Sequence, residues 1–157
     1  YIDKMKKQCF DISGDDFVKT KKLFDILKVP YYQAPLEAET MCADLCKRGL
    51  VDAVLSEDTD VLTYGAPIFL TKFNFKNATC VRIIHSDMLN QLELTSDQFV
   101  DLCIMCGTDY NKNIKGYGPA KSYKLMLNHG SIDNITNPDT SSLNHVRVRE
   151  IFTKYKQ

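Results

Sequence analysis

The feature that most constrains this chain is a repeated pattern in which a short, β-prone run is followed by a pair of acids. Glu37 and Glu39 follow the first run, and Asp58 and Asp60 follow the second. The two runs are residues 29–33 and 51–56. Strands that alternate with helices predict a parallel α/β sheet, and acids placed directly after such strands fall at one edge of it.

Periodicity along the rest of the chain predicts the other elements. Thr95 and Gln98 have the spacing of a capping box, and Pro119 suits the first turn of a helix. Further strands are expected at residues 68–73 and 80–85. Helices are expected at residues 15–28, 35–49, 59–64, 86–92, 95–107, 119–130 and 146–155. This order predicts an α/β core followed by a mostly helical part.

The gathered acids indicate a metal site. Ionised carboxylates that crowd together raise one another's pKa, and a hard divalent cation reverses this because Mg²⁺ prefers oxygen ligands. Asp109 follows the helix stop at Gly107 and can reach the same edge. Side chains at i and i+2 of a regular helix point apart. Glu37 and Glu39 therefore share an ion only if the helix start is irregular or if one binds through water. For any single acid, the alternative role is a helix cap.

The charge distribution favours a nucleic-acid partner, although the net charge is zero. Seven acids and two bases lie between Glu37 and Asp60, whereas residues 110–127 hold four lysines and no acid. An acidic centre beside a basic segment suits metal ions together with a phosphate backbone. For any single lysine, the alternative is a solvated surface position.

The six cysteines favour buried thiols over a zinc site. Cys42, Cys46, Cys103 and Cys106 lie in apolar helical patterns, and no second Cys/His pair stands at zinc-finger spacing. Reduced thiols predict an intracellular protein. No apolar run approaches the length of a membrane span.

The Gly-Tyr-Gly-Pro turn at residues 116–119 predicts a phosphate contact. Two glycines let the backbone approach a ligand closely, and the helix that starts at Pro119 points its free N–H groups outward. Lys115 and Lys121 flank the turn. The alternative is a tight turn between two packed helices.

Three motifs in this order resemble those of the flap-endonuclease/XPG nucleases. They are Val-Pro-Tyr-Tyr-Gln-Ala-Pro-Leu-Glu-Ala-Glu at 29–39, Ser-Glu-Asp-Thr-Asp-Val-Leu-Thr-Tyr-Gly at 56–65, and Phe-Val-Asp-Leu-Cys-Ile-Met-Cys-Gly-Thr-Asp-Tyr at 99–110. Lys-Gly-Tyr-Gly-Pro follows at 115–119. The resemblance extends from Cys9 to Asn134. It implies a PIN-like α/β nuclease core with two Mg²⁺ ions, for which Mn²⁺ can substitute. It also implies a helix–two-turn–helix element that grips duplex DNA, with a K⁺ ion.

The resemblance also implies roles for particular residues. The implied catalytic and metal-binding acids are Glu37, Glu39, Asp58, Asp60 and Asp109. The residues implied to lie against DNA are Glu37, Gly107, Asp109, Lys115, Gly116, Gly118 and Lys121. The chain then divides into the end of an arch or linker at 1–14, where Lys4, Lys6 and Lys7 lie, a nuclease core at 15–93, and a helical part at 94–157.

The implied function is that of a structure-specific 5′ flap endonuclease and 5′–3′ exonuclease in DNA replication and repair. We expect a monomer, nuclear if the host is a eukaryote. The family carries two further metal-binding aspartates in an N-terminal region, and many members carry a sliding-clamp-binding tail; neither is expected in this stretch. Tyr117 stands where the family usually has Ile. One alternative is a catalytically incomplete relative that grips duplex DNA without cutting it, and another is an RNA-directed PIN-type nuclease.

Overall fold

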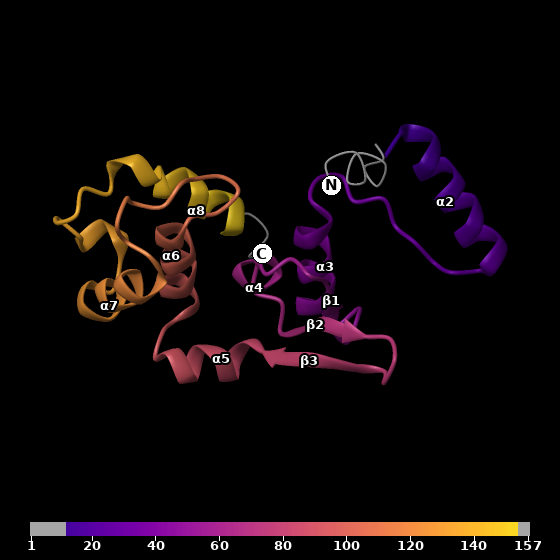
Figure 1. The fold of residues 1–157 in the computed structure, drawn as a ribbon, viewed down its shortest axis with the longest axis horizontal. Coiled ribbons are helices and arrows are strands. Elements are labelled where there is room, and N and C mark those ends of the chain that lie inside the picture. The colour runs from indigo at the N-terminus through magenta and orange to yellow at the C-terminus, as the bar shows by residue number, and fades with distance from the viewer. Residues whose placement is uncertain (1–11, 154–157) are drawn as a thin grey trace, which may run out of the picture. The chain divides into compact units, whose positions relative to one another are not determined.

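The computed structural model describes residues 12–153 of the chain, and Figure 1 shows the arrangement of its helices and strands. In chain order the elements are α2 (Gly14–Leu27), α3 (Ala38–Lys47), β1 (Val54–Leu55), α4 (Asp60–Thr63), β2 (Ile68–Asn74), β3 (Thr79–Ile84), α5 (His85–Leu92), α6 (Ser96–Cys106), α7 (Pro119–His129), the 3₁₀ turns η1 (Ile132–Asn134) and η2 (Ser141–Leu143), and α8 (His145–Thr153). Residues 1–34 form one compact unit and residues 35–157 a second. The predicted arch lysines, Lys4, Lys6 and Lys7, lie outside the described residues.

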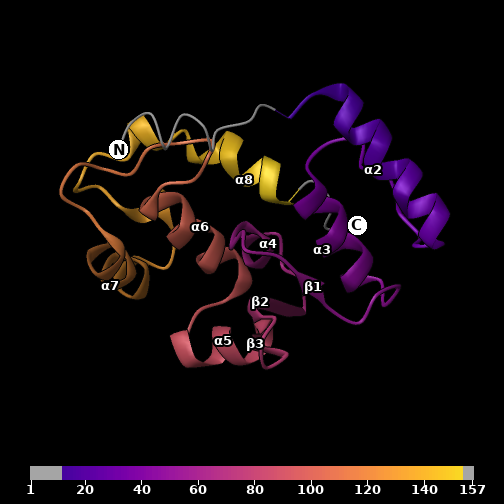
Figure 2. The same ribbon diagram turned by 45° about the vertical axis from the view of Figure 1, so that its right-hand side comes forward.

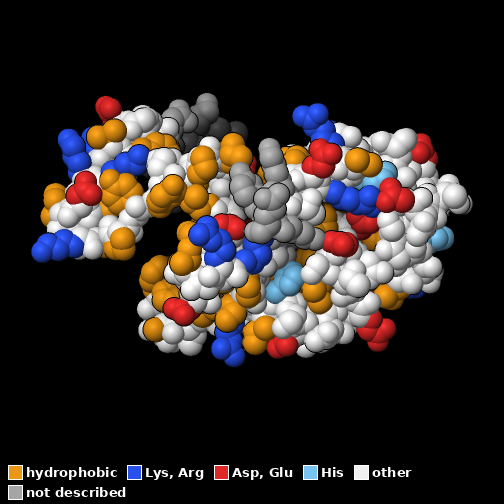
Figure 3. Space-filling model, turned by 180° about the vertical axis from the view of Figure 1, so that it is seen from behind, with side chains coloured by type: hydrophobic (Ala, Val, Ile, Leu, Met, Phe, Trp, Pro, Cys, Tyr) orange, Lys and Arg blue, Asp and Glu red, His pale blue; other side chains and the backbone are white. Residues whose placement is uncertain are grey.

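The described part of the first unit consists of α2 and an extended segment. Ser13 caps the helix, and its N–H donates a hydrogen bond of 2.9 Å to the Asp16 carboxylate. Apolar side chains such as Phe17 and Ile26 are exposed on α2. Figure 3 shows that hydrophobic and charged side chains both lie on the surface of the molecule. Residues 29–33, predicted as a strand, are wrong in that respect. They form no strand and join no sheet among the described residues, and Val29 N–H donates instead to Phe24 O at 2.9 Å, at the end of α2.

The second unit contains a three-stranded sheet in the order β1-β2-β3. β1 and β2 are parallel, with Val54 opposite Phe69. β3 runs antiparallel to β2, with Ile68 opposite Ile84, so the sheet is mixed and not wholly parallel as predicted. The reason is that a short turn joins β2 to β3, and a parallel pair needs a long crossover connection.

Helices cover this small sheet and extend the core beyond it. α3 and α4 lie beside β1, and α6 packs against α4, as Figures 1 and 2 show from two directions. The most buried side chains come from both the sheet and the helices. They include Val61, Phe69, Ile104, Met105, Met126, Leu143 and Val148. None of the helices within residues 12–153 has the length and apolar character needed to cross a membrane.

Two helices joined by two successive turns form the centre of the helical part. α6 begins with the predicted capping box, in which Thr95 N–H donates to Gln98 Oε1 at 2.8 Å. α7 begins with Pro119 at its first position and ends at Gly130 in the left-handed conformation, as predicted. Between them, one turn is closed from Thr108 to Asn111 and another from Ile114 to Tyr117.

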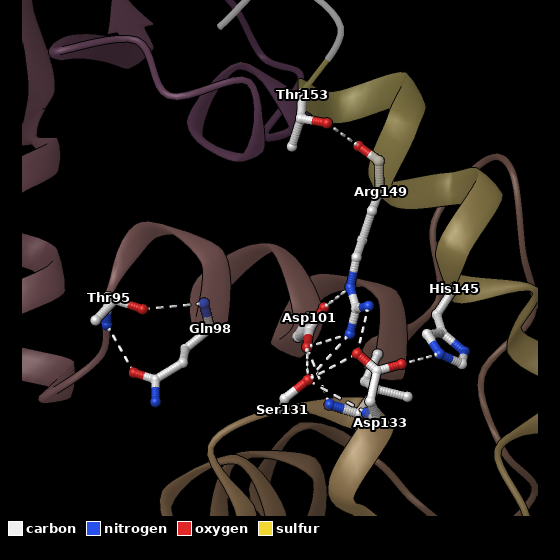
Figure 4. A network of polar contacts seen from close by, with 9 residues as sticks. Thr95, Gln98, Asp101, Ser131, Asp133, His145, Arg149 and Thr153 are labelled. Atoms are coloured by element: carbon white, nitrogen blue, oxygen red, sulfur yellow. Dashed lines mark hydrogen bonds and ion pairs between the residues drawn. The ribbon is translucent and has the colours of Figure 1, made fainter.

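An ionic network, drawn in Figure 4, fastens α8 to α6 and η1. Asp101 on α6 is 3% exposed, and its carboxylate accepts hydrogen bonds from the Arg149 guanidinium and, at 3.0 Å, from Ile132 N–H. Arg149 also donates to Asp133 at 2.7 Å, and His145 lies 2.8 Å from the other oxygen of Asp133. A buried charge needs such partners because its desolvation is expensive. The sequence analysis did not find this network.

Candidate metal and nucleic-acid site

Glu37 and Glu39 stand at the start of α3, but only one of them is in the helix. Glu37 is the N-cap residue, with extended backbone angles (φ −60°, ψ 132°), and Glu39 lies in the first turn. The two side chains are therefore not fixed in the opposed i, i+2 directions of a regular helix. The irregular start that a shared site required is present, because the helix begins at Ala38 and not at Pro35.

Asp58 lies in the loop between β1 and α4, and Asp60 is the first residue of α4. Ser56 Oγ accepts a hydrogen bond of 3.0 Å from Asp58 N–H, and Asp58 Oδ1 accepts one of 2.9 Å from Asp60 N–H. Side chains of the loop thus accept hydrogen bonds from its own backbone and shape the turn, and α4 starts at Asp60. Both acids follow the end of a strand, which is the sheet edge where the sequence analysis placed them.

Asp109 is the exposed tip of the turn after α6. Thr108 and Asn111 close this turn with backbone hydrogen bonds of 2.9 and 3.2 Å, and their side chains share a further bond of 2.8 Å. Asn111 Nδ2 also donates to Ile104 O at 2.8 Å, which ties the turn to the end of α6. Gly107 begins the turn with φ 93°, and a side chain there would come within 3.1 Å of Asn113 N.

The pKa of Asp60 responds to the negative charges of the other four predicted acids. The pKa of Asp60 is raised from 3.8 to about 6, first by burial and then by the negative charges of Asp58, Asp109, Glu37 and Glu39, in that order. Like charges disfavour ionisation only at short range. All four of the other predicted acids therefore lie within electrostatic reach of Asp60.

The donor chemistry of these acids fits a hard divalent cation, because all of them offer carboxylate oxygens. Their positions do not yet form a closed ligand set. Within residues 12–153, no three His, Cys, Asp or Glu side chains converge closely enough to hold an ion. The charges of Glu37, Glu39, Asp58 and Asp109 act on Asp60, but which of the five acids bind an ion remains a prediction.

Two tyrosines beside the acids were missed by the sequence analysis. Tyr64 and Tyr110 share a hydrogen bond of 2.9 Å between their hydroxyl groups, and both rings contact Phe152. The pKa of Tyr110 is raised by burial, by its bond to Tyr64 and by the charges of Glu37 and Asp60. The available signal was that Tyr64 and Tyr110 each lie at or next to the C-terminal end of a motif that carries predicted acids, at 56–65 and 99–110.

The turn before α7 brings together the predicted phosphate-contacting residues. Gly116 has φ 84°, a left-handed conformation that favours glycine, whereas Gly118 has φ −89° and caps α7. Lys121 donates to Gly116 O at 2.9 Å and lies 5.4 Å from the centre of the Tyr117 ring. Lys115 is exposed on the same turn. The N-terminus of α7 and two ammonium groups thus surround one short loop.

Comparison with known proteins gives the chain its relatives. Residues 28–109 match the model of the XPG I-region, a range that includes all five acids. Flap endonuclease 1-2 of Paramecium tetraurelia is 46% identical over 114 residues, covering 73% of this chain and 29% of that protein. Flap endonuclease 1 of Heterostelium pallidum is 40% identical over 161 residues, covering 96% and 42%. The chain spans less than half the length of these relatives.

Solved structures share the fold. Flap endonuclease-1 from Methanococcus jannaschii aligns with a TM-score of 0.79 and 28% identity, over 90% of this chain and 44% of that one. The junction-resolving enzyme GEN1 with product DNA and Mg²⁺ aligns with a TM-score of 0.64 and 24% identity, over 89% and 34%. The junction-resolving enzyme GEN-1 with potassium aligns with a TM-score of 0.69 and 21% identity, over 92% of this chain and 45% of that one. The fold is therefore the α/β core of these nucleases with its helical part, and the chain belongs to the XPG nuclease family, whose I-region it contains.

Proposed function

We propose that this chain carries part of the catalytic core of a structure-specific nuclease. The enzyme cuts DNA at a 5′ flap or a free 5′ end, as flap endonucleases and 5′–3′ exonucleases do in replication and repair. The observation that carries the proposal is the match of residues 28–109, which include all five acids, to the XPG I-region. The raised pKa of the half-buried Asp60 supports it, because the charges of the other four acids contribute to that shift. The flap endonucleases among the relatives support the choice of substrate.

In this proposal Glu37, Glu39, Asp58, Asp60 and Asp109 hold two Mg²⁺ ions, with Mn²⁺ as a substitute. The bound ions would supply an activated water and stabilise the leaving oxygen of the phosphodiester. The chain's own residues set the geometry. The Asp58–Asp60 hydrogen bond orients the loop after β1, and the turn closed by Thr108 and Asn111 presents Asp109. The Mg²⁺ in a GEN1 structure supports this cofactor.

We propose that the turn before α7 contacts the phosphate backbone of duplex DNA. Lys115 and Lys121 supply positive charge, and Gly116 and Gly118 allow close approach of the backbone. A K⁺ ion at the two turns is the finer part of this proposal, and the potassium in the GEN-1 structure supports it. Gly107, Asp109 and Glu37 would then lie beside the strand that is cut.

Phosphate contacts select duplex shape and a free end, without reading sequence. We propose that the protein acts as a monomer, in the nucleus if its host is a eukaryote. A sliding clamp is a further proposed partner, through a tail that does not form part of residues 1–157.

A second candidate is a DNA-binding role without cleavage. The sequence analysis raised it because two further metal-binding aspartates of the family are not expected in this stretch. The two candidates predict the same affinity for duplex DNA. They differ in whether products appear.

The deciding experiment incubates the complete protein that contains this chain, which spans less than half the length of its relatives, with labelled 5′-flap DNA and either Mg²⁺ or Mn²⁺. Cleavage that Asp60→Asn abolishes, with unchanged DNA affinity, is the expected result. Asp52→Asn is the matched control, because Asp52 is an exposed acid just before β1 and outside the group of five. Binding without products from the unsubstituted chain favours the second candidate, and products from Asp60→Asn overturn the first. A matched RNA flap tests the RNA-directed alternative.

A further inference from the structure

Glu57 lies between Ser56 and Asp58 but belongs to neither pair of predicted metal-binding acids. Its two carboxylate oxygens both accept hydrogen bonds from β2. Thr71 Oγ1 donates to Oε2 at 3.3 Å, and Lys72 N–H donates to Oε1 at 3.0 Å. The side chain therefore points along the sheet to the neighbouring strand, and Glu57 does not appear among the charges that raise the pKa of Asp60.

The hydrogen bond from Lys72 N–H to Glu57 gives an acceptor to a backbone N–H group at an irregular point of the sheet. The register between β2 and β3 shifts between Thr71 and Asn74, which is the mark of a bulge. Lys72 has φ 52°, a conformation that side chains other than glycine seldom adopt. Its N–H is turned away from β3 and needs another acceptor. Glu57 supplies that acceptor and so holds the bulge in place.

The same carboxylate holds the acidic loop. Ser56 N–H donates to Leu70 O at 3.0 Å, and Glu57 then bonds to the next two residues of β2. Directly afterwards the loop closes on itself through the Ser56–Asp58 and Asp58–Asp60 hydrogen bonds. The backbone of Ser56 and the side chain of Glu57 are thus anchored to β2, just before the loop that carries the acids.

We propose that Glu57 is a positioning residue for the metal-binding acids. It anchors the loop after β1 to the bulge of β2 and so fixes where Asp58 and Asp60 stand. This inference rests on the proposed function, because it assigns Glu57 a part in the site that the other five acids form. It predicts that Glu57 acts through its two hydrogen bonds and not through its charge.

Three substitutions separate these possibilities. Glu57→Ala removes both hydrogen bonds. Glu57→Gln removes the charge but keeps both bonds, because its oxygen can accept from Lys72 N–H and its amide can donate to Thr71 Oγ1. Thr71→Val removes one bond from the other side while keeping the shape of a buried β-branched residue. Asp52→Asn again controls for the loss of one negative charge near β1.

The first measurement is the affinity of the whole chain for Mn²⁺, determined by titration calorimetry. We expect Glu57→Ala to weaken Mn²⁺ binding about tenfold, the low end of the effect seen when groups that orient metal ligands are lost. Glu57→Gln stays close to the unsubstituted chain. Thr71→Val falls between them, and it adds nothing further when combined with Glu57→Ala. Urea unfolding of each variant measures its stability. It shows whether the loss of Mn²⁺ affinity is larger than a change in the free energy of unfolding would explain.

The second measurement needs no metal. Amide hydrogen exchange at Lys72 and Asp60 should accelerate at least tenfold in Glu57→Ala and remain slow in Glu57→Gln, because an amide that loses its acceptor exchanges from the open state. If the unsubstituted chain binds no Mn²⁺, the metal site fails while this exchange still decides the anchoring role. Unchanged exchange and binding in Glu57→Ala overturn the inference. Equal losses in Glu57→Gln and Glu57→Ala overturn it too, because the charge would then be responsible.

Discussion

The acids around Asp60 and the acids around Arg149 show two opposite uses of the same functional group within one chain. Asp60 has its pKa raised to about 6, because burial and four other carboxylates surround it. Asp133 has its pKa lowered to about 2, mainly because Arg149 and His145 hydrogen-bond to it. Both belong to the unit formed by residues 35–157.

The difference lies in where the compensating charge comes from. In the network at α8, Arg149 supplies it from within the chain, so the carboxylates there stabilise the fold. Asp60 instead lies in the field of other carboxylates, whose negative charges raise its pKa. Like charges held near one another reduce stability, and we expect such a group at a site for an external cation. The predictions below test this contrast, from the largest effect to the smallest.

Arg149→Met should produce the largest loss of stability. It leaves the buried Asp101 carboxylate without its cationic partner, and breaking a buried pair in this way costs about 3–5 kcal/mol. Urea unfolding of the whole chain measures the loss. Arg147→Met, which removes an exposed arginine from the same helix, is the control and should change stability by less than about 0.5 kcal/mol. A loss below about 1 kcal/mol would contradict the stabilising role of the network.

Asp60→Asn should raise the stability of the folded chain, whereas Arg149→Met should lower it. It removes one charge from the crowded group while keeping the size of the side chain, so the free energy of unfolding at neutral pH should rise by about 1 kcal/mol once solvent screening is allowed for. The measurement is urea unfolding in a chelator. A variant less stable than the unsubstituted chain would mean that Asp60 has a stabilising partner, and the contrast between the two regions would be lost.

The lowered pKa of Asp133 predicts that acid reduces the stability of the folded chain. Its pKa is lower in the folded chain than the ordinary value of 3.8. Its contribution to stability is therefore present above about pH 4 and is lost as the pH falls toward 2. Thermal unfolding midpoints between pH 2 and pH 5 should fall less steeply for Asp133→Asn than for the unsubstituted chain. Parallel curves for the two proteins would show that the pair with Arg149 contributes nothing measurable.

Lys115→Met should give the smallest effect, and on DNA binding alone. Removing one phosphate contact should lower the slope of log K against log salt by about 1, uniformly across sequences. Stability should change by less than about 0.5 kcal/mol, because Lys115 is exposed on a turn. Lys22→Met, an exposed lysine on α2, is the control. An unchanged salt slope for Lys115→Met would remove the turn from the proposed DNA interface.

Local sequence signals predicted most of the helices and the composition of the site. The Thr95–Gln98 box, Pro119 and Gly130 each report a requirement of one helix end, so they could be read without knowing the neighbours. Asp58, Asp60 and Asp109 could be placed from the sequence because each follows the end of a strand or helix, whereas the strand predicted before Glu37 and Glu39 does not form. The extended N-cap of α3 resolved how Glu37 and Glu39 avoid opposite faces of a helix.

The errors and omissions concern which backbones and side chains pair. Residues 29–33 have β-prone composition, yet a strand exists only where another backbone supplies hydrogen bonds. The strand–helix alternation that predicted a parallel sheet does not extend to β3, which a short turn joins to β2 in the antiparallel direction. Arg149 stands 48 residues from Asp101, and no local pattern announces their contact.

The amino-acid sequence by itself determined the helix ends, the α/β class and the identity of the acids, because caps, periodicity and strand–acid order are properties of neighbouring residues. Only the tertiary structure decided that Glu57 turns to β2 while Asp58 and Asp60 remain with the other acids, and that Arg149 neutralises Asp101. Which charges meet depends on how distant segments pack, and that distance sets whether a carboxylate is held neutralised or left for a cation.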